Sequence, residues 1–227
     1  LLVAHVAIRD PRGPLEIVHV VDTLQVHMAE FACWWKDGIS SDTQLLDLNE
    51  DYDFANAPVM QVLREAGDSG LCRFLGITSD DPERLALILG RLDLDVCLVA
   101  YGYNLLYRSA RRSALPISQQ KGVAYVAAGV VKLHPAYIRV HPDWLAARPS
   151  WVTPELRSSL QRLCDVQQAS GISAATLAVR YLVADPTIST ILVGAGSAAE
   201  IEESVAAAQQ GPLPADLHQQ IEQLGLP

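Results

Sequence analysis

Cysteine is scarce in this sequence, and so is positive charge. The 227 residues include four cysteines, and no two of them have the C-x-x-C spacing of a zinc site or a redox pair. They are Cys33, Cys72, Cys97 and Cys164. This usage fits a reducing compartment, so we expect a cytoplasmic protein. The net charge of −9, without any basic stripe, argues against nucleic acid and anionic membranes as main partners.

Long apolar runs and low-complexity linkers are also absent. The N-terminal run Leu1–Ile8 is too short to span a membrane and carries no basic leader, so we expect no membrane association and no targeting signal. No linker divides the chain. With half of its residues hydrophobic, a chain of this length can bury one substantial core. We therefore predict a single domain over residues 1–227.

What the sequence does contain is a regular alternation of apolar runs and amphipathic segments. Near-continuous apolar strands are typical of parallel sheets covered on both faces, so the alternation predicts a βα-repeating fold, either doubly wound or a (β/α) barrel. The predicted strands are Ile17–His27, Leu71–Thr78, Asp95–Tyr101, Val123–Ala128 and Ile188–Val193. The predicted helices are Ala55–Ser69, Asp81–Arg91, Ser109–Gln120, Thr153–Ala169, Ser173–Ala184, Ala198–Gln209 and Ala215–Leu224.

Two stretches are too long to be simple connections. Met28–Phe54 contains two tryptophans, and Leu133–Val152 contains His134 and His141. Long loops on such a fold usually shape a substrate site, and surface decoration is the alternative. The two histidines have no third ligand at a suitable spacing, so we predict no metal site.

A glycine-rich turn and a helix follow the last predicted strand. The turn is Gly194-Ala195-Gly196, and Ser197 opens the helix. Glycines let the backbone approach a ligand closely, and a helix N-terminus presents free N–H groups and partial positive charge to phosphate. The segment has the architecture of a nucleotide-phosphate cradle, with an ordinary connection between strand and helix as the alternative.

Four segments, taken in order, resemble the motifs of the aldo-keto reductases. Thr23–His27 is similar to a family strand that ends in a catalytic histidine, and Gly70–Thr78 to the next strand, G-K-x-R-x-x-G-x-S. Tyr103–Arg108 resembles the segment Y-N-L-x-x-R, and Val193–Ser204 resembles the cofactor segment P-G-x-x-x-x-x-x-x-x-E-N. Together they cover about residues 15–227 and are most similar to the branch that oxidises sugars or pyridoxal.

The resemblance implies a (β/α)8 TIM barrel that binds NAD or NADP at the C-terminal ends of its strands. It implies hydride transfer between the nicotinamide and an aldehyde, a lactol sugar or a related small carbonyl or alcohol substrate. His27 would be the catalytic residue that orients the carbonyl by hydrogen bonding. The implied cofactor contacts are Thr78, Ser79, Tyr103, Gly194, Gly196, Ser197, Glu200 and Ser204.

The chain also departs from the family pattern. The match begins near Ile17 with the fourth strand of the barrel, so the barrel is incomplete, with strands four to eight recognisable. The first three βα units, with the family's Asp, Tyr and Lys, are missing or unrecognised. Three explanations stay open: the sequence is part of a longer protein, segments have been left out, or it is a shortened relative that binds a nucleotide or a partner without turnover.

Three substitutions affect the implied cofactor site. Ala100 stands where many members have a glutamine for the nicotinamide amide, and Val131 where an aromatic ring usually stacks on the nicotinamide. Glu200 occupies the position of an arginine that pairs with the 2′-phosphate of NADP. A carboxylate repels phosphate and accepts a hydrogen bond from a ribose hydroxyl, so we expect NAD to be preferred. The substrate and the oligomeric state stay open.

Overall fold

A parallel sheet of five strands, in the order of the sequence, forms the centre of the fold. The structure is a computed structural model that describes residues 21–36, 38–39, 44–131 and 152–226. The strands are β1 (Val21–Val26), β2 (Cys72–Ser79), β3 (Val96–Ala100), β4 (Ala124–Ala128) and β5 (Thr190–Leu192). Each predicted strand is confirmed, although β5 is shorter than expected and residues 17–20 lie outside the described residues.

Seven α-helices occur in the described residues, and they confirm the predicted set within a few residues at each end. They are α1 (Pro58–Asp68), α2 (Pro82–Leu89), α3 (Ala114–Lys121), α5 (Pro154–Ser170), α6 (Ala174–Val183), α7 (Ala198–Gln209) and α8 (Ala215–Glu222). Three short 3-10 turns add to them: η1 (Ala32–Trp34), η2 (Phe54–Asn56) and η3 (Ser109–Arg112). The predicted helix over 109–120 is divided, since the backbone leaves helical geometry at Ser113 (φ −127°, ψ −91°).

Capping residues set the ends of several helices. Side-chain oxygens that precede a helix accept hydrogen bonds from the amides of its first turn. These N-cap residues are Asp81, Thr153, Ser173 and Ser197. At the other end, Gly122 and Gly171 adopt the left-handed conformation that favours glycine, and they end α3 and α5.

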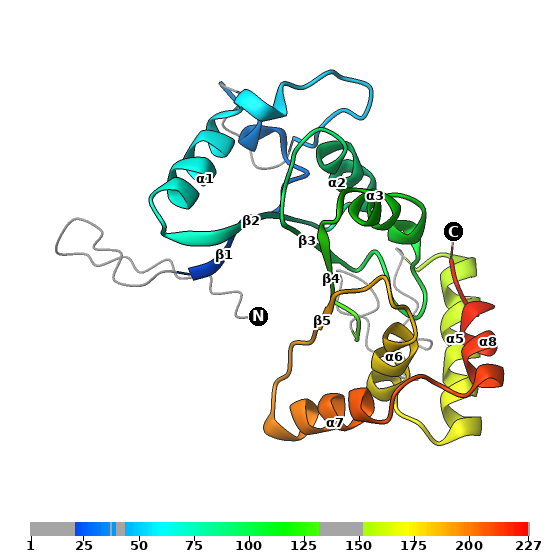
Figure 1. Cartoon of the computed structure of the whole chain (residues 1–227). Coiled ribbons are helices and arrows are strands. Elements are labelled where there is room, and N and C mark those ends of the chain that lie inside the picture. The colour runs from blue at the N-terminus through cyan, green and yellow to red at the C-terminus, as the bar shows by residue number, and fades with distance from the viewer. Residues whose placement is uncertain (1–20, 37, 40–43, 132–151, 227) are drawn as a thin grey trace.

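The sheet is curved and its helices lie along the convex side (Figure 1). Side chains that face the helices, such as Ile77, Val99 and Tyr125, belong to the main core. The residues that alternate with them on β3 and β4 form a second buried cluster on the concave face, as inward-facing side chains do in a TIM barrel. They are Val96, Leu98, Val126 and Ala128. The described strands thus form an open arc with β1 and β5 at its two ends.

Candidate active site

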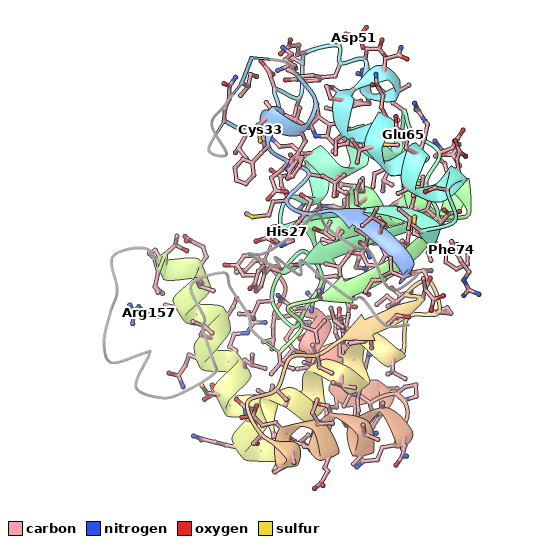
Figure 2. The ribbon with its side chains drawn as sticks, turned by 90° about the vertical axis from the view of Figure 1, so that its left-hand side faces the viewer. His27, Cys33, Asp51, Glu65, Phe74 and Arg157 are labelled. Carbon is pink, nitrogen blue, oxygen red and sulfur yellow. The ribbon has the colours of Figure 1, made fainter. Side chains whose placement is uncertain are left out.

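The carboxyl ends of all five strands lie along one edge of the sheet, because every neighbouring pair is parallel. The residues at or directly after these ends are His27, Ser79, Tyr101, Gly129 and Val193. In Figure 2, His27 lies at one margin of the sheet, and Phe74, near the start of β2, lies at the other. Parallel α/β folds bind ligands at the carboxyl edge, which is therefore the candidate active site.

His27 and the glycine-rich turn occupy opposite ends of that edge. His27 directly follows β1, Gly194 follows β5, and the strand order places β2, β3 and β4 between them. Four strand spacings amount to about 19 Å along a flat sheet, and the curvature shortens the direct line. Both features therefore lie on one edge of the sheet, with three strands between them.

Thr78 and Ser79 are buried at the end of β2, and their hydroxyls bond to protein atoms. The Thr78 hydroxyl accepts from the Met28 amide at 3.2 Å, and the Thr78 carbonyl accepts from the Ala29 amide at 2.7 Å. The Ser79 hydroxyl donates to the Asp81 carbonyl at 3.0 Å and accepts from the Asp81 amide at 2.9 Å. Both hydroxyls fix the turns that follow β1 and β2, and their contact with a cofactor stays a prediction.

Two acidic residues that the sequence analysis did not single out lie near His27. Glu30 is only 3% exposed, and its Oε2 has no hydrogen-bond partner among the described residues. Burial and the charge of Glu30 raise the pKa of the Asp80 carboxyl, and His27 opposes that shift. Glu30 and His27 therefore have opposite effects on the pKa of Asp80. A sequence signal existed, since Glu30 comes three residues after His27 and Asp80 directly after a strand end.

Tyr101 and Gly129 meet at the ends of β3 and β4. Tyr101 adopts a left-handed conformation (φ 61°), which is uncommon outside glycine, and its amide donates to the Ala128 carbonyl at 3.0 Å. Its ring lies over Gly129, where an added Cβ would approach Cδ1 of Tyr101 to 2.7 Å. Glycine is therefore required at position 129 both by its own positive φ of 65° and by the ring. The pair supplies an aromatic ring at the candidate active site.

The glycine-rich turn is exposed and leads directly into α7. An added Cβ at Gly194 would meet no atom within 4 Å. Ser197 caps the helix by accepting from the Glu200 amide at 3.3 Å, and the Glu200 carboxylate accepts from the Gly196 amide at 2.8 Å. This arrangement resembles a capping box and uses one of the amides that a phosphate would bind. The Ser204 hydroxyl donates within the helix to the Glu200 carbonyl at 2.9 Å.

Tyr103 lies in the core, where its ring and its hydroxyl contact protein. Tyr103 is 3% exposed, and its hydroxyl donates to the Asp185 carboxylate at 2.7 Å. Its ring packs edge-on against Tyr181, with centroids 6.2 Å apart. Burial and the bond to Asp185 raise the pKa of the Tyr103 hydroxyl. The sequence resemblance predicts a cofactor contact here, whereas the observed contacts are those of a packing residue.

The rest of the Y-N-L-x-x-R segment connects the sheet to the C-terminal helices. The Asn104 side-chain oxygen accepts from the amides of Leu106 and Tyr107. Buried Arg108 donates from Nε to the Tyr181 hydroxyl at 2.6 Å and from Nη2 to the Ile221 carbonyl at 2.7 Å. The segment therefore fixes α6 and α8 against the loop that follows β3.

A cavity of about 430 Å³ adjoins this arginine and is lined by residues of η3 and of the C-terminal segment. Arg111 in its wall donates to both oxygens of Glu222, at 2.8 and 3.1 Å. Glu222 also accepts from the Tyr181 hydroxyl at 2.7 Å. The charged groups that line the cavity are thus largely paired within the protein. None of the predicted site residues lines this cavity.

A lysine and a tyrosine come together in the loop after β1, as they do in the proton-transfer set that the resemblance implies. Lys36 forms an ion pair with Glu50, and its Nζ lies 4.9 Å from the centroid of the Tyr52 ring. The Tyr52 hydroxyl, however, accepts from the Asp47 amide at 2.8 Å, and burial raises its pKa. The polar groups of both residues are therefore bonded to other residues of the same loop.

Within the described residues, no three or more His, Cys, Asp or Glu side chains cluster in a way that could hold a metal ion. His134 and His141 lie outside the described residues. Within the same ranges, no helix combines the length and apolar character needed to cross a membrane. All four cysteines are unpaired, and Cys72, Cys97 and Cys164 are buried.

Two curated proteins resemble this chain in sequence. L-galactose dehydrogenase of Arabidopsis thaliana is 28% identical over 192 residues, which cover 82% of this chain and 52% of that protein. Pyridoxal 4-dehydrogenase of Microbacterium luteolum is 25% identical over 145 residues, covering 64% and 42%. The chain therefore spans about half the length of the curated relatives it matches.

Solved structures and a family model agree with this similarity. The aldo-keto reductase AKR11C1 from Bacillus halodurans, in its holo form, superposes with a TM-score of 0.56 at 21% identity, over 90% of this chain and 61% of that one. The thermostable aldo-keto reductase Tm1743 gives 0.55 at 19% identity. Both share the fold of this arc, which corresponds to part of a (β/α)8 barrel. The model of the aldo/keto reductase family matches residues 17–225, and the chain belongs to that family.

Proposed function

We propose that the protein is an NAD(P)-dependent oxidoreductase that transfers a hydride between a nicotinamide and a small carbonyl or alcohol substrate. Family membership supports the reaction class, and one observation supports this site: His27 and the turn at Gly194 lie at the same carboxyl edge of the sheet. The unpaired cysteines fit a reducing compartment such as the cytoplasm.

The glycine-rich turn fits a dinucleotide. Space is open around Gly194, and the amides that begin α7 carry the partial positive charge that attracts phosphate. The Gly196 amide already donates to Glu200, so the Ser197 hydroxyl and the other amides of the first turn are the donors at that end of the helix. When bound, NAD or NADP supplies or accepts the hydride. We further propose that NAD is preferred, because the Glu200 carboxylate already bonds to Gly196 and repels an additional phosphate.

His27 positions the reacting carbonyl. It is exposed at the end of β1, and the adjacent Met28 amide bonds to Thr78, which fixes the backbone there. A donated hydrogen bond from the imidazole stabilises negative charge that develops on the substrate oxygen. The relatives that act on L-galactose and on pyridoxal make sugars and aromatic aldehydes the first compounds to test.

The test is a titration with NAD and NADP by tryptophan fluorescence, followed by turnover of L-galactose and pyridoxal. We expect dinucleotide binding and turnover, and we expect His27→Ala to reduce kcat at least 100-fold with little change in dinucleotide affinity. Glu65→Gln, an exposed change on α1 far from His27 in Figure 2, is the matched control. Dinucleotide binding without turnover of any carbonyl compound would contradict the proposal.

A further inference from the structure

The backbone around Glu30, in the turn that follows β1, is hydrogen-bonded on both sides. The Ala29 amide donates to the Thr78 carbonyl at 2.7 Å, and the Glu30 carbonyl accepts from the Leu46 amide at 2.8 Å. The indole of Trp35 donates to the Ala29 carbonyl at 2.7 Å. These bonds connect the turn to β2 and to residue 46, and the Glu30 side chain is buried there.

The Glu30 carboxyl group is an exception to a strong rule. Buried polar atoms in folded proteins nearly always have a hydrogen-bond partner, and an unpaired one needs an explanation. Only 3% of the Glu30 surface is exposed, yet its Oε2 has no hydrogen-bond partner among the described residues. Burying an acceptor in this way costs free energy unless another molecule provides the donor.

Strain marks the same short segment. Met28, two residues before Glu30, has φ 54°, and the one other described non-glycine residue with positive φ is Tyr101, at the end of β3. Such conformations persist where the surrounding structure enforces them, and they occur preferentially at functional sites. Figure 2 places His27 and Cys33, which flank Glu30 in the chain, on the same side of the molecule. Glu30 therefore lies in a strained turn that directly follows the proposed catalytic histidine.

The charge around Glu30 indicates what kind of donor it accepts. Asp80 directly follows β2 and adds a second acidic group to this end of the edge, and burial and the charge of Glu30 raise the pKa of its carboxyl. Two carboxyl groups repel phosphates and carboxylates, and they accept hydrogen bonds from hydroxyl groups. Nearby Asp81 does not share this role, because its Oδ1 accepts from the amides of Glu83 and Arg84.

We propose that Glu30 is a specificity-determining residue that accepts a hydrogen bond from a hydroxyl of a neutral, hydroxyl-rich substrate held at His27. The inference rests on the proposed function and narrows its substrate class to unphosphorylated sugars and similar polyols. Asp80 extends the acceptor surface and disfavours anionic substrates. Glu30 fixes the substrate, and it takes no part in the transfer of the hydride.

The variant Glu30→Gln tests this role, because it removes the charge and keeps the shape. Kinetics use the neutral aldohexoses D-glucose, D-galactose and D-mannose, with propanal as an aldehyde that lacks hydroxyls. We expect the KM of the best hexose to rise at least 10-fold, while kcat/KM for propanal and the dinucleotide affinity change less than 2-fold. We also expect the thermal midpoint to be equal or higher, since the variant removes a buried charge.

An unchanged hexose KM, or an equal loss with hexose and propanal, would overturn the inference. Glu65→Gln on the exposed face of α1 controls for a general effect of lost charge. Wild-type protein should also use galactose 6-phosphate at least 10-fold less well than galactose, and Asp80→Asn should narrow that gap.

Direct binding separates this inference from the proposed function. Saturation-transfer NMR in the presence of a dinucleotide detects D-galactose on the protein whether or not it is turned over. Loss of the galactose signal in Glu30→Gln, with the wild-type signal present, supports the inference even where no turnover is measured. Absence of a galactose signal from wild-type protein that binds the dinucleotide overturns the inference and leaves cofactor binding standing.

Discussion

The guanidinium of Arg108 donates to the hydroxyl of Tyr181 at 2.6 Å, although the two residues are 73 positions apart in the chain. The same guanidinium reaches the carbonyls of Leu105, Ile221 and Glu222. One side chain therefore connects the loop after β3 with α6 and α8. Every nitrogen of the buried guanidinium donates a hydrogen bond. Removing this side chain would leave several buried oxygens without a donor.

Arg108→Lys should destabilise the protein by roughly 3 kcal/mol, because one ammonium cannot replace a planar fork that serves several acceptors. Urea unfolding measures the change in free energy. Arg112→Lys is the control, since Arg112 lines the same cavity but is exposed, and it should cost under about 0.5 kcal/mol. Equal effects for the two variants would show that the network around Arg108 contributes little.

Gly129→Ala should destabilise the protein by about 2 kcal/mol more than Gly122→Ala does. Both glycines have positive φ, 65° and 70°, so both substitutions strain the backbone. Only at Gly129 does the new Cβ meet a side chain, the ring of Tyr101 at 2.7 Å. Thermal unfolding of the two variants isolates the cost of that contact, and similar midpoints would show that the ring moves aside freely.

Glu200→Gln should lower the Kd for NADP about 10-fold and leave the Kd for NAD within 3-fold, since it removes a negative charge from the end of α7. Wild-type protein should bind NAD more tightly than NADP. Glu202→Gln, an exposed change on the same helix, controls for net charge. Tighter binding of NADP than NAD by the wild type contradicts the role given to Glu200.

Glu222 should make stability dependent on acid pH. Burial raises the pKa of the Glu222 carboxyl, but the hydrogen bond from Tyr181 and the charges of Arg108 and Arg111 outweigh it and lower the pKa below its ordinary 4.5. A depressed pKa in the folded state stabilises the protein above the unfolded pKa, and this stability is lost as the pH falls through the folded pKa.

The comparison of wild type and Glu222→Gln measures this dependence. Because the carboxylate is about one third exposed, solvent screening limits the effect to under about 1 kcal/mol. Unfolding free energies at pH 7 and pH 3 should therefore differ by less in Glu222→Gln than in the wild type. An identical pH dependence of the two proteins would exclude the carboxylate as the titrating group.

Much of the fold was predictable because strand and helix patterns here are local. Apolar runs gave the five strands, and helix ends followed capping residues such as Asp81 and Ser173. The helix predicted over 109–120 was wrong in one respect, since Ser113 interrupts it between η3 and α3. Pro116 is the sequence signal for that break, because a proline inside a helix lacks the amide that would bond to residue 112 and its ring clashes with that carbonyl, whereas the first turn of a new helix accepts it.

The site was predictable only as far as strand ends reveal it. A residue that follows a parallel strand lies at the carboxyl edge, which places His27 and Ser79 correctly from sequence order. Motif position says nothing about orientation, and Tyr103, from the same kind of evidence, lies in the core. Glu30 escaped notice because a glutamate in a long loop is usually exposed, and its burial depends on contacts with β2 and residue 46.

The order of the strands determines how the sheet can be extended by further βα units. Among the described residues, each strand pairs with its neighbours in the order of the chain, so the sheet is built in steps, as a stack of repeats is. A βα unit added before β1 would create one new ladder and leave the four existing ladders unchanged. His27 directly follows β1. A strand paired with the free side of β1 would therefore lie next to the proposed catalytic histidine.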